Sequence, residues 1–192
     1  MEENQIANFK VVIVGGSAGS LEVLMKVLPQ LKPISKFALI FVLHRKSAED
    51  NTLEQLIAMK TIIPVKHVED KTPLLPGFIY VAPSDYHLLF ETHHELSLDT
   101  SEKVNYSRPS IDVSFESAAG VYGPLLTGVL LSGANADGAY GLRIIKQHGG
   151  KVVVQDPATA DMPFMPQSAL NSVTPDFVLG VEELLHFINN MK

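Results

Sequence analysis

Four uninterrupted apolar segments stand out along the chain, each followed by small or polar residues. They cover residues 10–14, 37–43, 125–131 and 151–155 and consist mainly of Val, Ile, Leu and Phe. A strand with one face in water alternates apolar and polar residues, whereas a parallel strand covered on both faces is apolar throughout. The four segments are therefore predicted to be buried strands of a parallel sheet.

Helical spacing appears between these segments. The apolar residues after the first strand recur at Leu21, Leu24, Met25 and Leu28. A second helix is expected from 142 to the glycines at 149–150, and a last one, over residues 181–191, should pack through Leu184, Leu185 and Ile188. Alternating strands and helices indicate an α/β fold with a doubly wound, mostly parallel sheet flanked by helices.

Two further patterns concern the segments after the second strand. Asn51 and Glu54 have the spacing of a capping pair for a helix that runs through Met59. The runs 78–82 and 86–90 flank Pro83-Ser84-Asp85, and a third short run follows His93-His94. These three runs predict a small antiparallel hairpin or meander at one edge of the sheet.

Composition narrows the functional class. The 192 residues suffice for one substantial domain, and a formal charge of −6 gives no attraction to nucleic acid or to an anionic membrane. The absence of cysteine excludes disulfides, thiolate zinc sites and cysteine nucleophiles. The acidic, polar start MEENQIANFK is no signal peptide, and no apolar run reaches the roughly 18 residues of a membrane span. A cytoplasmic protein without membrane insertion is expected.

The first strand ends in a glycine-rich turn, Gly15-Gly16-Ser17-Ala18-Gly19, which fits G-x-S-x-G, the pattern of a turn that exposes a nucleophilic serine. The N–H groups of a helix that follows such a turn attract an oxyanion and a phosphate equally. A tight turn with no catalytic role is a third interpretation. The turn alone leaves the three alternatives open.

A dinucleotide site would need G-x-G-x-x-G and an acidic residue at the end of the second strand. Here Ser17 and Ser20 occupy the positions of the second and third glycines, and the second strand ends in His44. Nucleotide binding is therefore the weakest of the functional interpretations. No cofactor is expected.

His44 and Asp137 supply what a serine nucleophile needs. Each follows a predicted parallel strand, and the carboxyl ends of such strands lie at the same edge of the sheet. An imidazole can take the serine proton, and a carboxylate can orient the imidazole and stabilise its charged form. The alternative for Asp137 is a helix cap, and both roles are compatible. His93-His94 lack companions for a metal site, so no metal is expected.

Six segments in order resemble the catalytic domain of the chemotaxis-receptor methylesterases, the CheB family. They are GGSAGS, FVLH, GFIYVAPSDYHL, RPSID with FESAA after it, LLSGANADGAYG and MPQSAL. The resemblance runs from about Phe9 to the end of the chain. It implies a polar tail over residues 1–8, a catalytic domain over 9–192 and no receiver domain in this chain.

The resemblance also implies roles and partners. Ser17, His44 and Asp137 become nucleophile, base and orienting group, and the backbone N–H groups of Ala18 and Ala134 become oxyanion-hole candidates. The implied activity is hydrolysis of glutamate methyl esters on the cytoplasmic helices of methylated chemoreceptors, together with deamidation of receptor glutamines. Candidates for the substrate groove are Arg108, Met165 and Pro166.

Three positions depart from the pattern of the family. Ala18, Ser20 and Ala134 replace a threonine, a glycine and a methionine, which affects substrate fit more than chemistry. With no receiver domain in the chain, a separate regulatory or receiver protein is an implied partner. The competing hypothesis is a non-catalytic receptor-binding or scaffold domain that keeps the fold.

Overall fold

The computed structural model describes residues 9–46 and 51–192, so the predicted tail over residues 1–8 lies outside the described residues. Its main sheet has seven strands in the order β10-β9-β8-β1-β2-β5-β3, and neighbouring strands in it pair in parallel. The strands are β1 (Lys10–Gly16), β2 (Phe37–Leu43), β3 (Val65–Lys66), β5 (Ile79–Val81), β8 (Leu126–Leu130), β9 (Lys151–Gln155) and β10 (Phe177–Leu179). The predicted α/β architecture with a mostly parallel sheet is confirmed.

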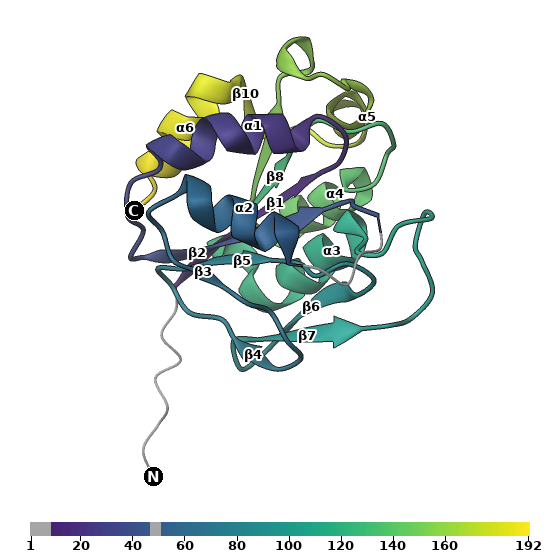
Figure 1. Cartoon of the computed structure of the whole chain (residues 1–192). Coiled ribbons are helices and arrows are strands. Elements are labelled where there is room, and N and C mark those ends of the chain that lie inside the picture. Colours follow the sequence, from purple (N-terminus) through teal and green to yellow (C-terminus); the bar gives the residue numbers. More distant parts are fainter. Residues whose placement is uncertain (1–8, 47–50) are drawn as a thin grey trace.

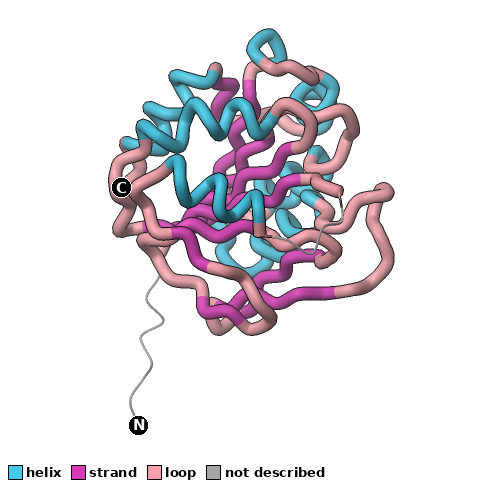
Figure 2. The backbone as a smooth tube through the Cα atoms, in the orientation of Figure 1, coloured by secondary structure: helices cyan, strands magenta, loops and turns pink. Residues whose placement is uncertain are grey.

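Helices cover both faces of this sheet, and the strands lie between two groups of them (Figures 1 and 2). One core contains residues of α1 (Ser20–Val27), α2 (Thr52–Lys60) and α6 (Val181–Asn189). The other contains residues of α3 (Ile111–Tyr122), α4 (Ala139–Gln147) and α5 (Phe164–Ser172). Short 3-10 turns occur at Leu28–Gln30, Gly123–Leu125 and Pro157–Thr159.

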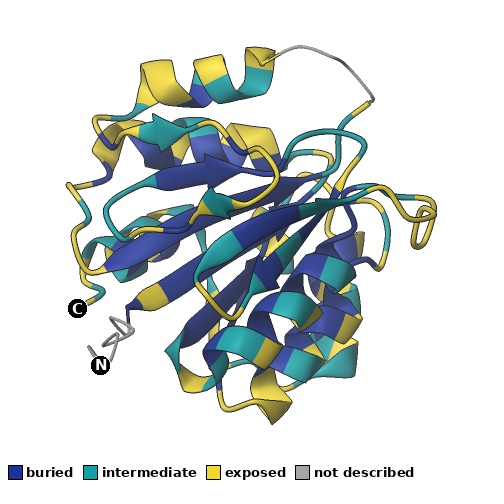
Figure 3. Ribbon diagram, turned by 90° about the horizontal axis from the view of Figure 1, so that it is seen from below, coloured by how far each residue is buried: buried dark blue, intermediate teal, exposed yellow. Residues whose placement is uncertain are grey.

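The central strands are buried on both faces, which explains their continuous apolar sequence (Figure 3). Along β1, Val12 and Val14 face the core with α1, α2 and α6, while Val11 and Ile13 face the core with α3, α4 and α5. The last helix packs as expected, with Leu184 and Ile188 buried and Leu185 partly buried against the same core. None of the helices in the described ranges is both long and apolar enough to cross a bilayer.

The predicted antiparallel pairing is confirmed for the run 86–90 with the run after His93-His94, but it is wrong for 78–82 with 86–90. Strand β5 joins the main sheet in parallel with β2, because a fully buried Ile-Tyr-Val run can be covered on both faces. The antiparallel part is a separate small sheet of β4 (Thr72–Pro73), β7 (Glu95–Asp99) and β6 (His87–Glu91). It packs on α3, where the Ser114 hydroxyl donates to the Leu88 carbonyl at 2.9 Å.

The capping pair predicted for α2 is also wrong. Asn51 precedes the helix but makes no side-chain capping hydrogen bond. Glu54 instead accepts two hydrogen bonds from the Arg45 guanidinium, at 2.8 and 3.2 Å. A bidentate, charge-assisted contact is stronger than a bond to one backbone N–H group, so the Glu54 carboxylate pairs with Arg45 instead of capping α2.

Close packing of α3 on α4 depends on a missing side chain at Gly141. A Cβ added there would lie 2.5 Å from the Cβ of Phe115 and 3.2 Å from the Cα of Asp112. Gly120 on α3 is the matched case, since a Cβ there would meet nothing within 4 Å in the described part of the chain. The packing of α3 on α4 therefore requires a glycine at position 141, whereas packing leaves room for a larger residue at position 120.

We expect Gly141→Ala to destabilise the fold by about 1–3 kcal/mol through overpacking. Gly120→Ala should stabilise it by up to about 1 kcal/mol, because alanine favours the helix. Urea unfolding of both variants measures the difference. Equal stabilisation by the two substitutions would contradict the close contact between α3 and α4.

Candidate active site

Ser17 follows β1 directly, at the carboxyl edge of the sheet. Its N–H donates to the Ser132 carbonyl at 2.9 Å, and its own carbonyl accepts from the Ser20 N–H at 3.0 Å and from the Ser20 hydroxyl. Its side chain is half-buried. The turn thus holds the serine backbone on both sides while leaving the residue accessible.

The glycines of the turn are required by their surroundings. A Cβ on Gly15 would lie 2.5 Å from Cγ2 of Ile111, and one on Gly19 would lie 2.6 Å from the Ser132 hydroxyl oxygen. A Cβ on Gly16, between the two, would lie 2.5 Å from the Cβ of Ser20. Gly19 also has a φ of 82°, which disfavours other residues. The G-x-S-x-G pattern therefore has a steric cause in this fold.

His44 lies beside Ser17 because their strands are neighbours in register. Gly16 pairs with Leu43, and the His44 N–H donates to the Gly16 carbonyl at 3.0 Å. The Nε2 atom of His44 lies 2.7 Å from Oδ2 of Asp137. Nδ1 is therefore the ring nitrogen that Asp137 does not engage.

Asp137 lies in the loop between β8 and α4, and its side chain is fully buried. Besides His44, it accepts hydrogen bonds from the N–H groups of Ile111 and Asp112, at 2.7 and 2.9 Å, and from the Ser110 hydroxyl at 3.1 Å. Burial by itself raises the pKa of Asp137, but the bonds from His44, Asp112 and Ile111 outweigh it and hold the pKa below its usual value. The carboxylate is thus ionised and fixed in place.

Asp112 is a member of this group that the sequence analysis did not single out. Its Oδ1 accepts from the N–H groups of Gly138 and Gly141, at 2.9 and 2.7 Å. Burial raises its pKa to about 6, and the negative charge of Asp137 adds to this increase although the two N–H groups oppose it. Its place in the RPSID segment, at the start of a helix, is the signal that could have pointed to it.

The oxyanion-hole candidates lie on two loops that Ser132 joins. The Ser132 hydroxyl donates to the Ala18 carbonyl at 2.7 Å and accepts from the Met162 N–H at 2.9 Å. Ala18 and Ala134 are exposed, and within the described ranges neither backbone N–H has an acceptor. Their role as donors to an oxyanion stays a prediction.

The substrate-groove candidates separate in the structure. Arg108 lines a cavity of about 300 Å³ together with His44, and its guanidinium donates to the carbonyls of Thr100 and Ser101, both at 2.9 Å. Met165 and Pro166 are buried, and their place among the substrate-groove candidates stays a prediction.

Met165 has a packing role. Its side chain lies under Gly133, where an added Cβ would come within 2.5 Å of Met165 Cε. Just before Met165, the apolar side chains of Met162 and Phe164 are exposed.

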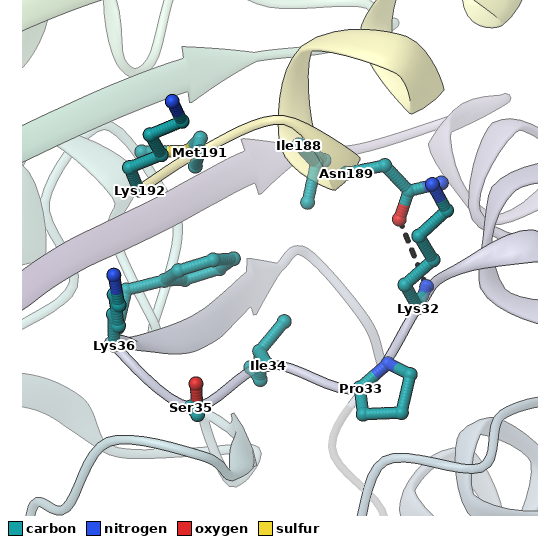
Figure 4. A pocket seen from close by; sticks show the side chains of 10 residues that line it. Lys32, Pro33, Ile34, Ser35, Lys36, Ile188, Asn189, Met191 and Lys192 are labelled. Atoms are coloured by element: carbon teal, nitrogen blue, oxygen red, sulfur yellow. Dashed lines mark hydrogen bonds between the residues drawn. The ribbon is translucent and has the colours of Figure 1, made fainter.

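Other candidate chemistry lies elsewhere. His94 contacts the Tyr122 hydroxyl through Nδ1 at 3.0 Å, and the described residues contain no cluster of three metal-ligating side chains. A cavity of about 150 Å³ with Lys32 and Lys36 in its wall lies at the amino end of β2, opposite to His44 (Figure 4). That cavity therefore does not belong to the candidate active site.

Comparison with known proteins gives consistent matches. The family model described as CheB methylesterase matches residues 12–188. A protein of Leptospira interrogans serovar copenhageni is 41% identical over 177 residues, which are 92% of this chain and 92% of that protein. The protein-glutamate methylesterase/protein-glutamine glutaminase of Thermotoga maritima is 31% identical over 173 residues, which are 88% of this chain and 50% of the relative.

One solved structure agrees over nearly its whole length. The crystal structure of the Thermotoga maritima CheB methylesterase catalytic domain matches with a TM-score of 0.89 and 29% sequence identity, covering 94% of this chain and 97% of that chain. The chain thus spans about half of the Thermotoga relative and almost all of its catalytic domain structure.

We expect Asp137→Asn to lower the free energy of unfolding at pH 7 by about 1–3 kcal/mol, because the amide nitrogen replaces an acceptor among backbone donors. The pKa of Asp137 is lowered by folding, so its contribution is present above the unfolded pKa of about 4 and is lost as the pH falls through the folded pKa. The difference in the free energy of unfolding between the wild type and Asp137→Asn should therefore become smaller below about pH 4. Chemical denaturation between pH 3 and 7 measures it.

The control is Asp156→Asn, a partly exposed carboxylate that accepts from the Ala158 N–H at 2.9 Å. It should change stability less at every pH. A difference for Asp137→Asn that stays constant down to pH 3 would contradict an ionised, hydrogen-bonded Asp137.

Proposed function

The chain belongs to the CheB methylesterase family and has the fold of its catalytic domain, and on that premise we propose that it removes methyl esters from glutamate side chains of chemoreceptors. The substrate sites are proposed to lie on the cytoplasmic helices of the receptors, and receptor glutamines are proposed as substrates for deamidation. The observation that carries the proposal is the 2.7 Å contact between His44 and Asp137, beside the turn that holds Ser17.

In the proposed reaction, Ser17 Oγ attacks the ester carbonyl carbon while Nδ1 of His44 takes the hydroxyl proton. The C–O bond to the methoxy group then breaks, and the imidazolium gives its proton to the departing oxygen, so that methanol leaves. Water attacks the acyl-enzyme with His44 again taking a proton, which returns to Ser17 as the bond to the acyl group breaks and the receptor's glutamate side chain is released as a carboxylate. A glutamine follows the same steps with ammonia as the leaving group.

Two features of the site support stabilisation of the tetrahedral intermediates. Asp137 is ionised beside Nε2 of His44 and favours the imidazolium formed during attack. The N–H groups of Ala18 and Ala134 are the proposed donors to the oxyanion. A backbone N–H group can donate whatever side chain its own residue carries. The replacements at these two positions therefore leave the chemistry intact.

The surroundings of His44 support an acidic protein segment as substrate. The cavity beside it is lined by Arg45, Lys46, Lys103 and Arg108, although the chain carries a formal charge of −6. Asp85 is the acidic residue of that lining. A local excess of positive charge attracts a segment rich in glutamate. A separate regulatory or receiver protein is the second proposed partner.

We expect Ser17→Ala to reduce methanol release from methyl-labelled receptor membranes by at least about a thousandfold, because the acyl-enzyme cannot form. Ser35→Ala, at the exposed amino end of β2, is the control and should retain wild-type activity. Receptor binding without turnover by the wild type would favour the non-catalytic scaffold. Unchanged activity in Ser17→Ala would refute the proposed nucleophile.

We expect Lys103→Glu to raise KM for the receptor substrate by about two- to fivefold at low salt, since an exposed charge contributes less than about 1 kcal/mol. The effect should shrink in 0.5 M salt, where exposed charges are screened. Lys151→Glu, at the other end of the sheet, makes the same change in net charge and serves as control. Equal effects of both variants would show that net charge, rather than the cavity, determines binding.

A further inference from the structure

Resting on the proposed function, we propose that Asp112 is a positioning residue for the catalytic group: it holds the loop that carries Asp137, and its negative charge strengthens His44 as a base. It does not touch the reacting atoms. It acts through Asp137 and through the start of α4, and three observations support this role.

The first observation is an exchange of caps between two helices. The N-cap of α4 is Gly138, which has no side chain to accept from the first turn. Asp112 supplies that acceptor from α3, because its Oδ1 binds the N–H groups of Gly138 and Gly141. Asp137, immediately before α4, accepts in turn from the N–H groups of Ile111 and Asp112 at the start of α3. Asp112 in the first turn of α3 thus caps α4, and Asp137 just before α4 caps α3.

The second observation is the place where Asp112 holds the loop. The N–H of Gly138 belongs to the peptide bond that joins Gly138 to Asp137, so the 2.9 Å bond to Asp112 fixes the backbone on one side of the candidate catalytic carboxylate. On the other side, the Asp137 N–H donates to the Asn135 side chain at 3.0 Å. Loss of the Asp112 acceptor would release the peptide adjacent to Asp137.

The third observation is the charge balance around the two carboxylates. Asp112 is 8% exposed and Asp137 is 1% exposed. His44 from the end of β2 and the first N–H groups of α3 face Asp137. The N–H groups of Gly138 and Gly141 at the start of α4 face Asp112. From β6, the Nδ1 atom of His87 accepts from the Ser110 N–H at 3.1 Å, so that nitrogen carries no proton. Once ionised, Asp112 therefore adds a second negative charge next to Asp137, the carboxylate that contacts His44.

Ionisation of Asp112 gives the role a pH dependence. Its pKa is about 6, so it is largely ionised at pH 8. An Asn at this position keeps an oxygen that can accept from Gly138 and Gly141 but carries no charge. Asp112→Asn therefore separates the charge from the cap, whereas Asp112→Ala removes both.

The test is the pH profile of kcat/KM for methanol release from methyl-labelled receptor membranes, between pH 5 and 9. For Asp112→Asn we expect the midpoint of the acid limb to move down by about 0.5–1 pH unit and kcat/KM at pH 8 to fall about threefold or more. Asp112→Ala should lower kcat further. If Asp112→Ala does not fold, Asp112→Asn alone decides the outcome.

The matched control is Asp176→Asn, which also removes one charge from a carboxylate that accepts a backbone N–H, here that of Val152 at 2.8 Å. Its acid limb should stay at the wild-type midpoint. If the wild type is active and Asp112→Asn leaves the pH profile of kcat/KM unchanged, the role of Asp112 is overturned while the proposed function stands. The same follows if Asp176→Asn shifts the acid limb as much as Asp112→Asn does. An inactive wild type would refute the proposed function, and this role with it.

Discussion

The exchange of helix caps between Asp112 and Asp137 is the interaction on which the candidate site depends. The two helices that follow these caps pack closely because Gly141 has no side chain, and their N-termini meet at two buried carboxylates. Burying a charge is unfavourable unless hydrogen bonds replace the lost water, and the first-turn N–H groups provide them. The arrangement leaves Oδ2 of Asp137 directed at His44, so the same contacts that join α3 to α4 also orient the imidazole.

The parallel sheet converts this local arrangement into a site. Strands β2 and β8 flank β1 and run parallel to it, so the residues that follow these three strands lie at one edge of the sheet. Ser17 is placed by hydrogen bonds to Ser132 and Ser20, and His44 by a hydrogen bond to Gly16. These positions are defined by backbone hydrogen bonds, together with the Ser20 hydroxyl that donates to the Ser17 carbonyl.

The sequence predicted the strands themselves better than their partners. The runs 37–43 and 151–155 match β2 and β9, because a continuous apolar run suits a strand that is buried on both faces. The run 78–82 contains β5, but its partner depended on which strand lay next to it in space, and it pairs with β2 instead of with 86–90. Similarly, Met165 lies in a segment that resembles the family, but only packing decided that its side chain fills the space under Gly133.

The sequence by itself determined the fold class, the glycine turn around Ser17 and the polar residues that follow the strands, because backbone conformation and strand burial are local properties of the chain. The tertiary structure alone decided which atoms meet. It assigned Nε2 of His44 to Asp137, brought Asp112 from α3 to the start of α4, and buried Met165 and Pro166. The reason is that hydrogen-bond partners and burial depend on how distant helices pack, and no spacing along the chain records that packing.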